Sequence, residues 1–160
     1  MTALQITIPL IFSVAAIVMC FFRRVPAFLA AYAAYVSAGL LGAMRVPVDQ
    51  YVIWGFIALI DTVNIYSTKM IAPKAMHLYS VVGCLVGSVV GAVVGSVAAV
   101  MVGGLIGALL GYLAYTRTPQ GRACASMPFT HRLSMLAGTA CTAWFSFVLV
   151  ATVCSALIVQ

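Results

Sequence analysis

The sequence carries very little charge. Only 6% of its 160 residues are charged, with two acidic residues against eight basic ones, whereas 65% are hydrophobic. A soluble domain normally has about a quarter charged residues, which cover its surface. The composition therefore excludes a soluble domain and predicts a chain that lies in a lipid bilayer.

The motifs of common enzymes are missing as well. No pair of carboxylates could share the roles of general acid and general base, and the sequence has no nucleophile elbow, no HExxH and no Walker A lysine. The five cysteines form no CxxC pair and have no Cys/His metal spacing. We therefore expect no enzymatic activity, no cofactor and no metal site.

The formal net charge of +6 does not indicate a nucleic-acid partner. The basic residues stand singly or in pairs between apolar runs, and no basic stripe with interleaved aromatic residues is present. This distribution is typical of charges that flank membrane segments, so the lipid bilayer is the expected partner.

Uncharged runs long enough to cross a hydrocarbon core of ~30 Å define the expected helices. They predict one all-α, polytopic integral membrane domain over residues 1–160, with about six membrane-embedded helices. The expected helices cover residues 3–22, 25–44, 51–66, 78–95, 103–116 and 133–159.

Residues 75–116 form a run of 42 residues without formal charge. One helix of that length would reach about 63 Å, twice the thickness of the hydrocarbon core, so the run is expected to reverse. Cytoplasmic loops collect Lys and Arg. With a reversal, seven basic residues lie inside and Arg45 alone lies outside, whereas a single crossing splits them four to four. This count predicts a hairpin, fully spanning or re-entrant, with its turn between Ser96 and Gly104 and both chain termini extracytoplasmic.

Glycines recur every fourth residue within this hairpin, with Ala99 continuing the period between its two arms. A spacing of four places them on one helix face, where glycine lets another helix backbone approach closely. The arms are expected to pack on each other or on neighbouring helices, and a zipper between copies of the chain or around a pore is the alternative. The residues expected to pack are Gly83, Gly87, Gly91, Gly95, Gly103, Gly107 and Gly111.

Asp61 is the only acidic residue inside an apolar segment, and Asn64 shares its helix face. A carboxylate within the membrane is a candidate site for a cation or a proton. The structural alternative is that Asp61 lies near the cytoplasmic interface, where it pairs with Lys69 or caps the hairpin.

The order of segments resembles that of a known family. An apolar helix that ends with an acidic residue is followed by a short basic linker, in the segment LIDTVNIYSTKMIAPK (residues 59–74). Two glycine-spaced arms follow, in VGSVVGAVVGSVAAVMVGGLIGALLGYL (residues 86–113), and after them come a cationic loop and a last helix. This order resembles the bacterial membrane-protein family catalogued as domain of unknown function 456. The resemblance implies a glycine-zipper fold and a bacterial inner membrane, but no activity.

Two functions are compatible with these features. The first is a non-enzymatic integral membrane protein, packed through its glycine-zipper hairpin, that acts alone, as a homo-oligomer or as a small subunit beside another membrane protein. The second is a small transporter or channel with a proton or cation site at Asp61 and Asn64. A conduction path through the hairpin would need polar groups, and its first arm offers only Ser80, Ser88 and Ser96.

Overall fold

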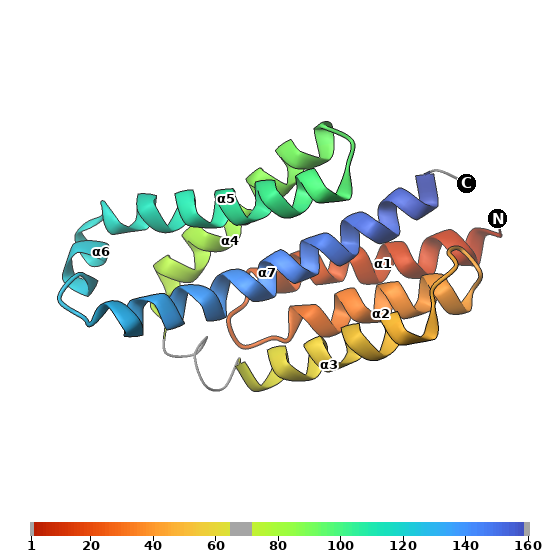
Figure 1. The fold of residues 1–160 in the computed structure, drawn as a ribbon, viewed down its shortest axis with the longest axis horizontal. Helices are drawn as coiled ribbons and strands as arrows, with labels where there is room; N and C mark the ends of the chain where they lie inside the picture. Colours follow the sequence, from red (N-terminus) through yellow and green to blue (C-terminus); the bar gives the residue numbers. More distant parts are fainter. Residues whose placement is uncertain (1, 65–71, 159–160) are drawn as a thin grey trace.

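The structure is a computed structural model that describes residues 2–64 and 72–158. Within these residues it contains seven helices and no strand, which confirms the all-α prediction (Figure 1). The helices are α1 (Ala3–Cys20), α2 (Ala27–Leu40), α3 (Val48–Asn64), α4 (Lys74–Val93), α5 (Val97–Thr116), α6 (Pro119–Cys124) and α7 (Phe129–Ile158).

Four of these helices are long and apolar enough to cross a membrane, namely α1, α4, α5 and α7. The apolar helix α2 has 14 residues and would rise only about 21 Å, which is less than the thickness of a hydrocarbon core. The chain is thus a membrane protein by composition and helix length. The expectation that α2 and α3 also span stays a prediction.

Proline sets the start of most helices, and this explains why the observed boundaries differ from the expected ones. In α2, α3, α4 and α7 the first helical residue follows directly after Pro26, Pro47, Pro73 or Pro128. Proline is tolerated at a helix start because its missing N–H would have no partner there. As a result α4 and α7 begin four residues earlier than the expected helices 78–95 and 133–159.

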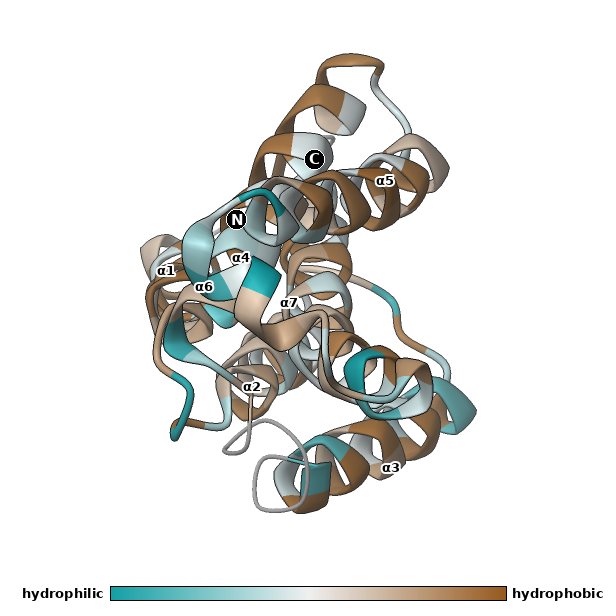
Figure 2. Ribbon diagram, turned by 90° about the vertical axis from the view of Figure 1, so that its left-hand side faces the viewer, coloured by the Kyte–Doolittle hydropathy of each residue, from teal (hydrophilic) through white to brown (hydrophobic). Residues whose placement is uncertain are grey.

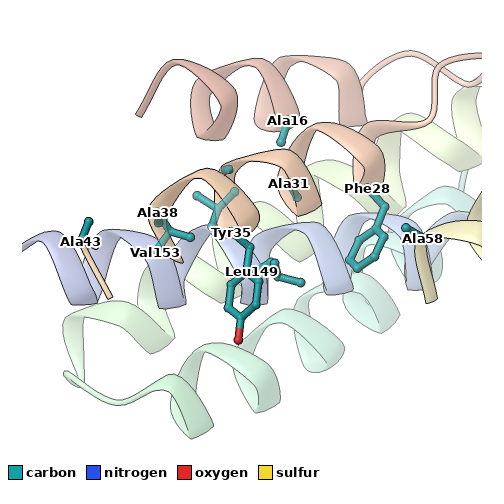
Figure 3. Packing of buried hydrophobic residues seen from close by; sticks show 11 residues of the cluster. Ala16, Phe28, Ala31, Tyr35, Ala38, Ala43, Ala58, Leu149 and Val153 are labelled. Atoms are coloured by element: carbon teal, nitrogen blue, oxygen red, sulfur yellow. The ribbon is translucent and has the colours of Figure 1, made fainter. Parts of the chain in front are cut away.

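The long helix α7 lies in the middle of the bundle (Figure 1). It packs against α1 and α2 on one side and against the α4–α5 hairpin on the other, while α3 packs mainly against α2. Small side chains allow close packing of α1, α2 and α7, with larger side chains between them (Figure 3). The buried cluster contains Ala16, Phe28, Ala31, Tyr35, Ala38, Leu149 and Val153.

The described basic residues gather at one end of the bundle. Six of them lie in the α1–α2 loop, at the start of α4, at the end of α5, in α6 and in the first turn of α7. Arg45 lies in the loop between α2 and α3, which is at the opposite end of the bundle (Figure 1). A view onto the first end shows hydrophilic residues in the loops and in α6, with largely hydrophobic helices behind them (Figure 2). The six are Arg23, Arg24, Lys74, Arg117, Arg122 and Arg132.

The uncharged run does reverse, but its turn lies earlier than expected. Helix α4 ends at Val93 and α5 begins at Val97, so Gly103 and Gly104 lie inside α5 rather than in the turn. Gly95 supplies the turn with a φ of +85°, and the Ser96 hydroxyl caps α5 by accepting a hydrogen bond from the Ala99 N–H at 3.1 Å. The prediction that Gly103 and Gly104 form the turn was therefore wrong, because packing against a neighbouring helix outweighs the weak helix propensity of glycine.

Candidate functional site

Asp61 and Asn64 both face α7 from the last turn of the described part of α3. The carboxylate oxygen Oδ1 of Asp61 accepts a hydrogen bond from the Thr142 hydroxyl, and Asn64 Nδ2 donates one to the carbonyl oxygen of Gly138 at 3.1 Å. Asp61 is 8% exposed, although it is one of only two acidic residues in the chain. The structure thus brings the two predicted site residues together on one helix contact.

The partner of Asp61 lies deep within the bundle. Thr142 is near the middle of the 30-residue α7, which places the carboxylate at the same level. The expected ion pair with Lys69 stays a prediction, because Lys69 lies outside the described residues. A carboxylate this deep in an apolar chain is costly to ionise without hydrogen-bond donors, and Thr142 supplies one.

A cleft between α3 and α7 opens beside Asp61. Its volume is about 680 Å³, which is within the range of small-ligand sites. Most of its lining is apolar, and the polar groups among the described residues are Asp61, Asn64, Ser134 and Cys141. One acidic group within an apolar lining suits a proton or a cation with an apolar body.

Metal-ligating and nucleophilic side chains are sparse beside the cleft, among the residues that the structure describes. No three His, Cys, Asp or Glu side chains gather closely enough to hold a metal ion in the part of the chain that the structure describes. Among the described residues that line the cleft, Cys141 is the only thiol, and no histidine is present as a general base.

Helix α7 carries a stripe of hydroxyl groups that was not among the site residues predicted from the sequence. Thr139, Thr142 and Ser146 are all buried, and each donates a hydrogen bond to a carbonyl one turn earlier in α7. Thr142 alone shares its single O–H between the Gly138 carbonyl and the Asp61 carboxylate. The signal was present in the sequence, because a spacing of three and then four residues places these side chains on one helix face.

The glycines of α4 and α5 lie where the two backbones approach most closely. A Cβ atom added to Gly87 would overlap the carbonyl oxygen of Gly103 and lie 3.0 Å from the Cα of Gly107. At Gly91 the added atom would lie 2.7 Å from the backbone nitrogen of Val100. The same conflict with backbone atoms of the opposite helix occurs at Gly83, Gly103, Gly107 and Gly111.

Gly95 does not take part in this contact. A Cβ atom added there would have no heavy atom within 4 Å, and the residue lies in the turn with a positive φ. The four-residue period thus continues into the turn. There glycine is required because the backbone has a positive φ, and not because another helix approaches closely. The expected packing role of Gly95 is therefore corrected to a turn role.

Gly104, which is outside the four-residue register, faces α7 rather than α4 alone. An added Cβ atom would lie 3.0 Å from Cδ1 of Trp144 and 2.7 Å from Oγ of Ser88. The Trp144 indole also donates a hydrogen bond to the carbonyl oxygen of Met101 at 2.7 Å. Gly103 therefore lets α5 approach the backbone of α4, and Gly104 lets α5 approach side chains of both α4 and α7.

These features define an all-helical membrane protein with a buried acidic residue and a close helical hairpin. Comparison with protein-family models, curated proteins and solved structures finds no match. The resemblance to the bacterial family of unknown function stays a prediction, and the functional argument rests on this chain's own geometry.

Proposed function

We propose that the chain is a non-enzymatic, multi-pass integral membrane protein of a bacterial inner membrane, with the α4–α5 glycine zipper as its packing core. The observation that carries this proposal is the combination of four helices of membrane-crossing length with basic residues gathered at one end. Because cytoplasmic loops collect Lys and Arg, that end is cytoplasmic in the proposal, and both termini are extracytoplasmic.

The glycine contact supports a structural role within one chain. Six of the seven glycines would conflict with the backbone of the opposite arm if they carried a side chain. The glycine faces of α4 and α5 are therefore buried against each other within one chain. A second copy or a larger membrane partner that binds the hairpin would therefore contact its outer face. That face is apolar and exposed, with Val86 at 56%, Val90 at 61% and Leu110 at 59%.

Cysteine labelling tests the proposed orientation. The five native cysteines are replaced by alanine, and single cysteines are introduced at two exposed positions, Gln120 in α6 and Val48 at the start of α3. A membrane-impermeant maleimide should label the cysteine at 48 in intact cells and the one at 120 only after lysis. Labelling at 120 from outside would contradict the orientation.

A second function is supported by the cleft beside Asp61. Ser80 and Ser88 are buried within the bundle, which argues against a polar path along the hairpin. The α3–α7 cleft instead offers a buried carboxylate beside a space of about 680 Å³. The alternative proposal is a small transporter that binds a proton or a cation at Asp61.

Flux measurements in reconstituted vesicles test the transporter proposal. Asp61→Asn removes the charge with little change of size, and Asp49→Asn is the matched control because Asp49 is exposed in the first turn of α3. Proton or organic-cation flux present in the parent should be lost with Asp61→Asn and kept with Asp49→Asn. Equal flux in both variants would remove Asp61 from the site.

A further inference from the structure

The basic end of the bundle contains a pocket that is separate from the α3–α7 cleft. It has a volume of about 580 Å³ and lies between the α1–α2 loop and the first turn of α4. Three cationic side chains, Arg23, Arg24 and Lys74, line it together with the exposed apolar side chains of Phe22 and Leu78. The pocket is therefore both positively charged and partly apolar.

Arg23 builds this pocket as well as lining it. Its Nη1 donates a hydrogen bond to the carbonyl oxygen of Ala72, a fully buried residue two positions before α4. This bond ties the α1–α2 loop to the start of α4 and engages only one of the five N–H donors of the guanidinium group. The buried His77 adds a second tie, because its Nε2 lies 3.0 Å from the carbonyl oxygen of Cys20.

The cationic side chains of the pocket have no acidic side chain of the protein beside them. The sequence has two acidic residues, and both lie in the described part of the chain. Asp61 lines the α3–α7 cleft, and Asp49 lies in the first turn of α3, toward the opposite end of the bundle (Figure 1). No acidic side chain of the protein therefore neutralises the three cations, and their charge can attract an anionic ligand.

We propose that this pocket binds the phosphate group of an anionic phospholipid, with the acyl chains lying along Phe22 and Leu78. Arg and Lys form charge-assisted hydrogen bonds with phosphate oxygens, and basic pockets between membrane helices suit anionic head groups. The positive end of the α4 dipole lies at the same place and adds to the attraction. A free phosphate ion has the same charge chemistry, but it would leave the apolar part of the pocket uncovered. This site is independent of the function proposed for Asp61.

Thermal unfolding of the delipidated protein in detergent tests this site. Dioleoyl phosphatidylglycerol, dioleoyl phosphatidylcholine and inorganic phosphate are added separately at equal concentrations. A ligand that binds only the folded state raises the Tm in proportion to the logarithm of its concentration above Kd. Phosphatidylglycerol should raise the Tm of the parent by several degrees, while phosphatidylcholine and inorganic phosphate should raise it much less.

Three double variants distinguish lipid binding in this pocket from a general electrostatic attraction of the lipid to the basic end of the bundle. Arg24→Gln with Lys74→Gln should abolish the response to phosphatidylglycerol, and Arg24→Lys with Lys74→Arg should keep it. The matched control is Arg117→Gln with Arg122→Gln, which removes two exposed charges at the same end of the bundle and should keep the response.

Three results would overturn the proposal. An equal loss in the control variant would show that the charge of this end, rather than the pocket, attracts the lipid. An equal rise with inorganic phosphate would assign the pocket to a soluble anion. Equal stabilisation of the parent by both lipids would reject anionic selectivity, whatever the variants do.

Discussion

Replacing Gly87 by alanine should destabilise the protein, even though alanine is the better helix former. The added methyl group would overlap the carbonyl oxygen of Gly103, and it would also lie 2.8 Å from that carbonyl carbon and 3.0 Å from the Cα of Gly107. All of these neighbours are backbone atoms, so no side-chain rotation can relieve the conflict. Helices α4 and α5 must separate instead.

The size of the effect depends on two opposing contributions. Overpacking of this kind typically costs ~1–3 kcal/mol. The gain in helix propensity from glycine to alanine is about 1 kcal/mol. Because the conflict involves backbone and affects the central contact of two 20-residue helices, we expect a net loss of about 1–2 kcal/mol. In a chain of this length, that corresponds to a Tm lower by about 2–8 °C.

Thermal unfolding in detergent measures this loss, and Val90→Ile is the matched control. Both substitutions add one carbon atom to α4, but Val90 is 61% exposed and lies off the glycine face. We expect the control to change the Tm very little. If Gly87→Ala and Val90→Ile had the same stability, the two arms could not be in the backbone contact described above, and the hairpin core would have to be abandoned.

Two further predictions concern the turn and the buried acid. Gly95→Ala should lower the free energy of unfolding by about 1–2 kcal/mol, because a φ of +85° strains any residue with a Cβ atom, even where the surrounding space is open. Thermal unfolding measures this loss, and a variant as stable as the parent would contradict the turn conformation. Thr142→Val removes the hydroxyl donor to Asp61 and should cost ~1–3 kcal/mol. Thr152→Val, whose hydroxyl donates only to the carbonyl oxygen of Val148 in its own helix, should cost less; the reverse order in denaturation experiments would argue against the Asp61 contact.

The reversal of the long apolar run could be predicted from the sequence because it depends on limits that the bilayer imposes on any chain. A helix of 42 residues is too long for the hydrocarbon core, and the basic residues are concentrated on one side of the membrane only if the run returns. The exact turn was harder to place. Both Gly95 and Gly103 fit the four-residue period, and only the backbone angles distinguish a turn glycine from a packing glycine.

The acidic site could be predicted only in part. Asp61 and Asn64 stand out because polar residues are rare in this chain, and their spacing places them on one face of α3. Their partners, Thr142 and Gly138, lie more than 70 residues away, and a single sequence does not reveal which helix α3 faces. The hydroxyl stripe on α7 could have suggested a polar contact, but not its partner.

The helices of this protein are held together by more than one kind of contact, and hydrogen bonds between side chain and helix join α3 to α7 in addition to apolar packing. Helices α4 and α5 approach through glycine backbones, whereas the backbone of α3 packs mainly against α2, and a cleft opens along part of its contact with α7. Lipid supplies no hydrophobic driving force between helices, so side-chain hydrogen bonds carry more of the contact where packing is sparse. Between α3 and α7, Asp61 accepts one such bond from Thr142 and Asn64 donates another to Gly138, and both α3 residues also line the cleft. Any change in the charge of Asp61 therefore acts on the attachment of α3 and on the cleft at once.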